Sequence, residues 1–304
     1  MNRLKNIVLV MSLFFVLPYT ASTNSKASTE AKAYVYKAFQ YIYNFEFQKA
    51  DSVRTIVNKG FPGTPFTHLL NANYFWWRII SGEDAPENIT NYNNVVSSAV
   101  ASVKANKKAT FSNEEVFVFI NLYAFRVRLD LLHYKIISAV TKLDECIKYF
   151  KLSFGNESKY APFTLTSGLY NYFIAYATDT YPITIPYFMF YPKGDIVKGL
   201  AQLSAASISP DIILNTEGNY FLMKIYFEQR KNFIIAKAYS KNLIAKYPKN
   251  LLYQYFYFSI LNKGGEKAAA QNQLKVLMKQ AYSNKQISQK QRNYFINMAE
   301  KEIK

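Results

Sequence analysis

The side chains that most often carry out catalysis or bind metals are few in this chain and widely spaced. His68 and His133 are the two histidines, and neither has a second histidine or a cysteine at the short spacing that zinc sites use. Cys146 is the one cysteine, and it falls in a segment with amphipathic helical spacing, where a thiol is typical of a small core residue. The sequence therefore predicts no metal site, no cofactor and no catalytic cysteine.

Two short patterns resemble parts of phosphate-binding motifs, and neither is complete. Gly194 and Gly199 have the internal spacing of a phosphate loop, but Leu200 stands where that loop requires a lysine. Residues 191–195, Tyr-Pro-Lys-Gly-Asp, form a turn before an expected helix, where backbone N–H groups could bind an anion. Asp195 would cap that helix and repel the anion, so a turn that starts a helix is the simpler interpretation. We expect the chain not to be an enzyme.

The elements that would position any site are predicted to be helices. The chain has 304 residues, half of them apolar, with 26 Tyr and 24 Phe but 10 Gly and 10 Pro. Scarce glycine and proline favour long uninterrupted elements, and apolar residues recur at the intervals of amphipathic helices, as at Tyr34, Ala38 and Ile42. The aromatic side chains are expected to fill the contacts between helices, because each buries a large area. We predict an all-α fold.

Capping and breaking residues predict where several helices begin and end. Ser112 and Glu115 form a capping box that begins a helix at Asn113. Asp195 is a good N-cap for a helix over 196–207. The other expected helices are a pair within 28–60, single helices over 67–80, 89–106, 113–133 and from 134 or 136 to 154, a helix with Pro162 in its first turn that contains 166–176, and several helices within 216–299.

Residues 178–195 are the most irregular part of the predicted fold. Three prolines occur there among several aromatic residues, and proline neither donates to a helix ladder nor favours a helical residue before it. We expect a loop or a broken helix whose aromatic side chains either pack on neighbouring helices or face a partner. The candidate contact residues in this loop are Tyr187, Tyr191 and Lys193.

One set of offsets occurs near both ends of the chain. It is found at Ala38, Tyr41, Ala50 and Pro62 and again at Lys224, Phe227, Ala236 and Pro248. Small and aromatic residues at these intervals, closed by proline, describe a helix–turn–helix unit of about 34 residues. Such a unit cannot bury its apolar face alone, so stacked neighbours and an α-solenoid are expected.

These residues resemble the tetratricopeptide repeat, in which aromatic and small residues precede an alanine and a proline at fixed offsets. The resemblance covers 31–64 and 217–250 well, extends over 251–284 and reaches 65–98 in part. Lys224 departs from it, because the family prefers a small residue there. The resemblance implies a tetratricopeptide-like α–α superhelix, a solenoid of helical hairpins, as a single domain over 23–304.

A second resemblance covers residues 160–261. Gly-Leu-Tyr-Asn-Tyr at 168–172 and Tyr-Pro-Lys-Asn at 247–250 are similar to segments of exported tetratricopeptide-like proteins of Bacteroidetes-type bacteria. This similarity implies a location in the cell envelope and adds no activity. Tetratricopeptide arrays bind proteins or peptides on a concave face formed by the first helix of each pair. The candidate groove residues implied by that geometry are Phe39, Ile42, Phe221, Ile225, Glu228, Tyr255 and Asn262.

Residues 1–22 are predicted to be a signal peptide. Arg3 and Lys5 precede an apolar run over 7–17, and small residues at 20–22 suit cleavage. That run is shorter than the roughly 20 residues that a membrane span needs, and no later run approaches that length. A chain without disulfides fits a bacterial periplasm better than a secreted animal domain. We expect an exported protein without a membrane span after cleavage, located in the periplasm or, alternatively, outside the cell.

The formal net charge of +17 favours anionic partners such as acidic proteins or lipid head groups. The lysines are spread along the chain, so a solvated basic surface without specific use stays open as an alternative. Export argues against nucleic acid as a partner. Our leading hypothesis is a non-catalytic exported scaffold that binds a protein or peptide. The alternative is a glycan- or lipid-binding envelope protein, for which Trp76, Trp77 and the aromatics of 181–191 should be exposed.

Overall fold

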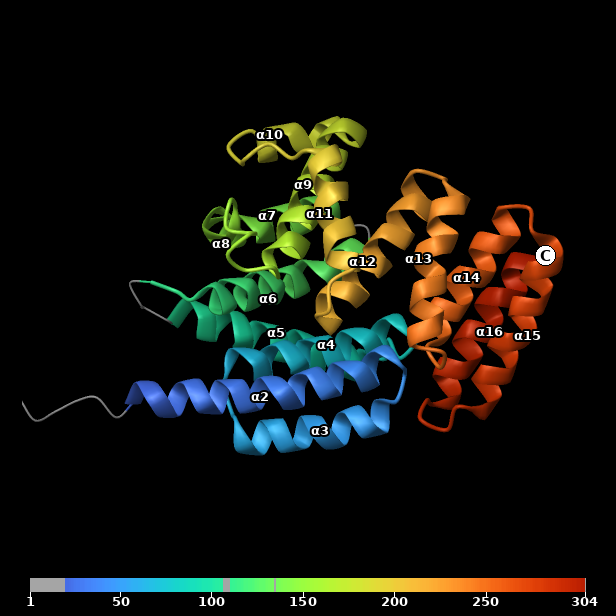
Figure 1. Cartoon of the computed structure of the whole chain (residues 1–304), viewed down its shortest axis with the longest axis horizontal. Coiled ribbons are helices and arrows are strands. Elements are labelled where there is room, and N and C mark those ends of the chain that lie inside the picture. The colour runs from blue at the N-terminus through green and yellow to red at the C-terminus, as the bar shows by residue number, and fades with distance from the viewer. Residues whose placement is uncertain (1–19, 106–109, 134, 304) are drawn as a thin grey trace, which may run out of the picture.

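The computed structural model describes residues 20–105, 110–133 and 135–303, and every regular element in these ranges is a helix (Figure 1). The prediction of an all-α fold is confirmed. Residues 1–19, which hold most of the predicted signal peptide, lie outside the described residues. Among the helices that are described, none combines the length and the apolar character needed to cross a bilayer.

The N-terminal helices form consecutive pairs. They are α2 (Thr20–Tyr43), α3 (Phe47–Gly60), α4 (Pro65–Ile80), α5 (Pro86–Ala105) and α6 (Asn113–Leu132). α2 packs on α3 and α4 packs on α5, while α4 also contacts α2 and α6. The predicted capping box begins α6: Ser112 Oγ accepts from the backbone N–H of Glu115, and the Glu115 carboxylate accepts from the backbone N–H of Ser112.

The helix predicted from 134 or 136 to 154 begins at Ile136 but is interrupted. The structure has α7 (Ile136–Leu143), a 3₁₀ turn η1 (Asp144–Cys146) and α8 (Ile147–Ser153) in its place. Contacts with the preceding helices hold the turn, because Glu145 pairs with Lys104 at 2.7 Å and with Arg126 at 2.9 Å. Cys146, the last residue of the turn, is completely buried. The prediction of one continuous helix was wrong. The interruption depends on these tertiary contacts, and no helix-breaking residue in the sequence marks it.

Two of the helices that follow pack unusually close to each other. They are α9 (Phe163–Thr180), the 3₁₀ turn η2 (Pro182–Thr184), the short α10 (Ile185–Phe188) and α11 (Ile196–Ser207). Asp195 caps α11 by accepting from the backbone N–H of Lys198 at 2.9 Å, as predicted. A Cβ atom at Gly199 would lie 2.6 Å from the backbone nitrogen of Tyr172, so only glycine allows α11 to approach α9 this closely.

The C-terminal helices are again arranged as consecutive pairs. They are α12 (Ile212–Lys224) with its π-helical continuation η3 (Ile225–Gln229), α13 (Phe233–Lys246), α14 (Leu251–Lys263), α15 (Lys267–Ser283) and α16 (Gln289–Ile303). Each helix contacts the next, and α16 also contacts α14. Asn232 and Asn250 begin α13 and α14 by accepting backbone N–H groups with their side chains.

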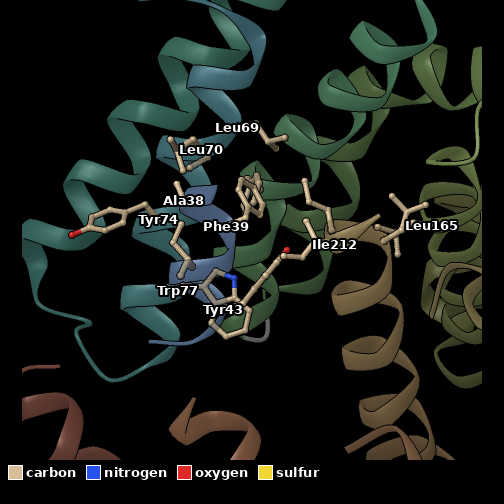
Figure 2. Close-up of a cluster of buried hydrophobic side chains, with 14 of the residues drawn as sticks. Ala38, Phe39, Tyr43, Leu69, Leu70, Tyr74, Trp77, Leu165 and Ile212 are labelled. Atoms are coloured by element: carbon tan, nitrogen blue, oxygen red, sulfur yellow. The ribbon is translucent and has the colours of Figure 1, made fainter. Parts of the chain in front are cut away.

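A single aromatic core connects the N-terminal and C-terminal pairs. Figure 2 shows buried side chains of α2, α4, α9 and α12 that belong to this core. Trp77 of α4 lies at its centre, with ring centroids 5.6 Å from Tyr43, 6.0 Å from Tyr220 and 5.7 Å from Tyr253. Each such pair contributes about 0.5–1.5 kcal/mol beyond the area that it buries. These contacts join α2 and α4 to α12 and α14.

The turn 43–46 between α2 and α3 also contacts two C-terminal turns. Asn250 donates a side-chain hydrogen bond of 2.7 Å to the carbonyl oxygen of Tyr43. Asn284 donates one of 3.3 Å to the carbonyl oxygen of Phe45. We call the turn 43–46 together with Asn250 and Asn284 the closing junction. An array in which each unit contacts only its neighbours has no such contacts, so the helix pairs stack but the first and last of them also meet.

Candidate functional site

The predicted groove residues on α2 and η3 do not share a surface. Phe39, Ile42 and Ile225 are 3%, 0% and 1% exposed, because they pack in the aromatic core. Glu228 is exposed, and its carboxylate pairs with Lys224 at 2.9 Å on the same helical stretch. Phe39, Ile42 and Ile225 are too enclosed to contact a partner while the helices stay packed. In this structure they stabilise the core.

The remaining predicted groove residues, on α12 and α14, are half-buried. The ring of Phe221 lies 6.2 Å from that of Phe173 on α9. The Tyr255 hydroxyl donates to the Glu302 carboxylate at 2.7 Å, and the Asn262 amide donates to the backbone oxygen of Glu302 at 3.4 Å. Helix α16 therefore covers the side of α14 that the repeat pattern assigns to a groove.

The irregular segment predicted at 178–195 is partly packed and partly exposed. Tyr187 is 39% exposed and Lys193 is exposed, whereas Tyr191 is half-buried and donates its hydroxyl proton to Asp144. Phe190 is 82% exposed. Of the two tryptophans, the first of the pair is half-buried and the second belongs to the core. Exposed aromatics that a stacking site needs thus occur in this segment and at Tyr282 and Tyr294, but not at the tryptophans.

A buried polar cluster lies between α2, α4, α6 and α12. The Tyr43 hydroxyl donates a hydrogen bond of 2.8 Å to Glu217, and burial raises the pKa of this carboxyl group while the charge of Arg128 opposes the shift. The adjoining cavity, of about 10 Å³, is lined by polar groups that include the side chain of Asn73, whose amide nitrogen has no partner among the described residues. That volume suits one water molecule and is far below the size of a ligand site.

Among the described residues, Cys146 is buried and His68 is half-buried. Burial raises the pKa of the Cys146 thiol well above its usual range, which disfavours the reactive thiolate. Burial also lowers the pKa of His68. Within the described ranges, no three His, Cys, Asp or Glu side chains are arranged as a metal-binding group. The geometry of these groups offers no nucleophile paired with a base.

An open cleft of about 490 Å³ lies between the α4–α5 turn and α16. We call it the α16 cleft. Its volume falls in the range of small-molecule and peptide-side-chain sites. Its lining residues are Gly82, Asp84, Gln289, Lys290, Asn293, Tyr294 and Asn297.

The α4–α5 turn forms a fixed wall of this cleft. Gly82 has φ +95°, and a Cβ atom there would lie 2.5 Å from Cγ of Tyr294, so the turn presses directly on the α16 ring. Behind it, the buried Gln291 amide donates to Ser81 Oγ at 2.6 Å, although the two residues are 210 positions apart. Lys290 and Asp84 form an exposed ion pair of 2.9 Å across the mouth. The wall is therefore held in place by contacts with α16 itself.

Three side-chain amides follow one another along the exposed side of α16. Gln289, Asn293 and Asn297 are exposed, and none has a hydrogen-bond partner elsewhere in the described chain. Their spacing of four residues places them on one side of the helix, about 6 Å apart along its axis. Each amide offers both donors and an acceptor. We call these three residues the amide row.

The α16 cleft was not predicted from the sequence. The i, i+4, i+8 spacing of three amides in an exposed helix was the available signal. The opposite wall, at residues 82–84, comes from a turn far away in the sequence, and nothing in the local pattern places it beside α16. None of the predicted contact residues lines the α16 cleft. Of the predicted residues, Phe39 is the one that lies among the residues lining the small internal cavity.

Comparison with protein-family models, with curated proteins and with solved structures found no match to this chain. The interpretation of the α16 cleft therefore rests on its own geometry and chemistry.

Proposed function

We propose that this chain is a non-catalytic, exported scaffold of tetratricopeptide-like helix pairs that binds a protein or peptide in the cell envelope, in the periplasm. The observation that carries the proposal is the amide row in the α16 cleft. A peptide backbone needs paired donors and acceptors at regular intervals, and unpaired side-chain amides on a rigid helix supply them.

The spacing of the amide row fits an extended peptide. Four residues of an α-helix advance by about 6.0 Å, and two residues of an extended chain advance by about 6.6 Å. Gln289, Asn293 and Asn297 would therefore meet every second residue of a segment that runs along α16. Successive amides also rotate by about 40° around the helix axis, which limits the match to a short segment that curves with the helix.

The other lining groups of the cleft suit the same ligand. Tyr294 is 38% exposed and offers an aromatic ring beside the amides. The ion pair of Lys290 with Asp84 is exposed, and such pairs contribute only about 0–1 kcal/mol. Both charges can therefore exchange partners at little cost when a ligand enters. The net charge of +17 accelerates encounter with acidic partners.

The order of the helix pairs supports the tetratricopeptide-like part of the proposal. The four windows that resemble the repeat coincide with observed pairs: 31–64 with α2–α3, 65–98 with α4–α5, 217–250 with α12–α13, and 251–284 with α14–α15. Helix α16 then occupies the position of a first helix in a further unit. The α16 cleft lies where this helix approaches the α4–α5 unit.

The proposal is tested by crosslinking and affinity purification of the tagged protein from its own cells, followed by mass spectrometry. The wild type is compared with Asn293→Ala/Asn297→Ala and with the control Gln271→Ala/Asn272→Ala, which removes two exposed amides of α15. We expect one envelope protein to be recovered with the wild type and the control and to be lost with the cleft variant. Equal recovery with the cleft variant, or no protein above an untagged strain, would contradict the proposal.

A library of eight-residue peptides displayed on phage tests the ligand class directly. Selected peptides should bind the purified wild type and the α15 control alike, and should bind the cleft variant roughly tenfold more weakly for each 1.4 kcal/mol of lost hydrogen bonding. A glycan presents hydroxyl groups to the same amides. Binding to a glycan array that depends on Asn293 and Asn297, without peptide binding, would assign the cleft to carbohydrate instead.

A further inference from the structure

Residues 181–190, which we call the tip segment, expose an unusual number of apolar side chains. The segment contains η2 and α10, which stand at the upper edge of the molecule in Figure 1. Together its exposed side chains present on the order of 600 Å², the size of the largest apolar patch of a typical monomer. They are Tyr181 (47% exposed), Ile183 (67%), Ile185 (49%), Tyr187 (39%), Met189 (66%) and Phe190 (82%).

The tip segment is anchored, so its exposure does not come from a frayed loop. Phe188 is 7% exposed and packs against Tyr170 and Ile174 of α9. The buried Thr184 donates its hydroxyl proton to the carbonyl oxygen of Ala177 at 3.1 Å. Phe188 and Thr184 thus anchor the segment, and the apolar side chains between and beside them face solvent.

The exposed surface of the tip segment carries no charge. Residues 180–192 include no Asp, Glu, Lys, Arg or His. A charged protein surface would gain nothing electrostatically from this segment, whereas the boundary between lipid head groups and acyl chains accepts aliphatic side chains. Tyrosine, with an apolar ring and a polar hydroxyl, is favoured at that boundary. The composition therefore fits a membrane surface.

Cations surround the base of the tip segment. Exposed lysines occur in three places: on α8, whose side chains pack against the cluster that contains Phe188; directly after the segment; and in the first turn of α11. They are Lys148, Lys151, Lys193 and Lys198. None of them has a carboxylate partner among the described residues. By contrast, Asp144 accepts from Tyr191, and Asp195 is engaged as the cap of α11. Hydrogen bonding does not remove the charge of Asp144 or Asp195, and the exposed Asp179 lies two residues before the segment. The four lysines outnumber these carboxylates, so a small positive excess remains at the base and complements anionic head groups.

We propose that the tip segment docks on the surface of an anionic lipid bilayer, with its apolar side chains at the boundary of head groups and acyl chains. The surrounding lysines then lie at the level of the phosphates. Such binding is peripheral and reversible. It goes beyond the peptide binding proposed for the α16 cleft and does not depend on it, because the two surfaces share no residue.

Vesicle co-sedimentation of the full chain tests this inference. Phosphatidylcholine vesicles with and without phosphatidylglycerol are compared for the wild type and for Met189→Asp/Phe190→Asp. The matched control is Ile208→Asp/Ile234→Asp, which introduces the same charge at two isoleucines that are 83% and 81% exposed, at the C-cap of α11 and on α13. We expect the wild type to bind the anionic vesicles, the tip variant to bind them roughly tenfold more weakly, and the control to stay close to the wild type.

Three outcomes would overturn the inference. The first is a wild type that does not bind anionic vesicles, which leaves the tip segment to a protein partner. The second is an equal loss of binding in the tip variant and the control, which shows that net charge alone acts. The third comes from sedimentation velocity without vesicles. If the wild type is a dimer and the tip variant is a monomer, a second copy of the chain covers the segment.

A labelled variant reports the position of the tip segment directly. Phe190→Cys carries an environment-sensitive dye at the most exposed site of the segment, and Cys146 is too buried to react with the label. The dye emission should shift to the blue on addition of anionic vesicles. The same dye at Ile234→Cys should show no shift. An unshifted emission at position 190 while the protein sediments with vesicles would place the contact elsewhere on the molecule.

Discussion

The hydroxyl of Tyr43 donates a hydrogen bond of 2.8 Å to the carboxyl group of Glu217, and both side chains are buried. Tyr43 is the last residue of α2, and Glu217 lies on α12, 174 positions later. Burial raises the pKa of both groups, and the Glu217 charge raises that of Tyr43 further, so Tyr43 stays a hydrogen-bond donor. The contact makes the stability of the fold depend on the protonation of one carboxyl group.

Glu217→Gln should change the pH dependence of stability. The folded-state pKa of Glu217 is raised above its unfolded value of about 4.3, so the folded chain binds the proton more tightly. This contribution is complete below the unfolded pKa and is lost as pH rises through the folded pKa. Glutamine accepts the Tyr43 hydrogen bond without ionising. We expect the variant to match the wild type at acidic pH and to be more stable at neutral pH, measured by urea unfolding.

The exposed Glu228→Gln is the control for this experiment, and its pH profile should follow that of the wild type apart from a small surface effect. Parallel profiles for Glu217→Gln and the wild type would contradict the assigned role of Glu217. A lower stability of Glu217→Gln at neutral pH would contradict it as well.

Asn250→Ala should destabilise the chain more than the loss of an ordinary helix cap. Asn250 accepts the backbone N–H of Tyr253 at 3.1 Å and donates to the carbonyl oxygen of Tyr43, with no exposed surface. Loss of a cap costs about 1 kcal/mol, and an unsatisfied buried carbonyl adds about 1–3 kcal/mol. We expect a decrease of about 2–4 kcal/mol in the free energy of unfolding, measured by denaturant titration. Asn232→Ala, at the exposed cap of α13, should cost about 1 kcal/mol; equal costs would refute the contribution of the closing junction.

Gly82→Ala should disturb the wall of the α16 cleft. Gly82 combines φ +95° with a position where a Cβ atom would overlap Tyr294. Backbone strain and overpacking together predict a loss of about 2–4 kcal/mol in unfolding free energy. Gly155 has φ +76° and open space around it, so Gly155→Ala should lose only about 1–2 kcal/mol. Thermal unfolding of both variants measures the difference, and an equal shift would mean that the turn does not press on α16.

Cys146 should be unreactive in the folded protein. The thiol is fully buried, and burial raises its pKa. We expect a chromogenic disulfide reagent to label it only as fast as the chain unfolds, and completely in denaturant. Rapid labelling under native conditions, with kinetics that depend on reagent concentration, would show that the segment 144–146 opens locally without global unfolding.

Local signals in the sequence predict most helix ends correctly. Ser112 with Glu115, and Asp195, satisfy backbone N–H groups within one turn, so their effect is decided by neighbouring residues alone. The interruption at 144–146 could not be predicted, because it depends on Lys104, Arg126 and the burial of Cys146. The π-helical stretch Ile225–Gln229 likewise has no distinctive local pattern.

The candidate groove shows the limit of a repeat pattern. The offsets predict which residues lie on the first helix of each pair, and the helices are found there. Exposure is set by what lies opposite, and no local pattern reveals that Trp77 and Tyr253 enclose the end of α2 or that Glu302 covers Tyr255. The amide row was visible as a spacing, but its significance depends on the turn at residues 82–84.

The closing junction constrains the order in which the chain reaches its final structure. The carbonyl oxygens of Tyr43 and Phe45 accept from Asn250 and Asn284, so these two hydrogen bonds are both formed only after the chain has been synthesised to residue 284. Closing a loop of this length carries an entropic cost, and contacts between distant residues slow folding. The N-terminal pairs can pack locally before that point, but the contacts of the turn 43–46 with the C-terminal pairs are among the late steps of assembly.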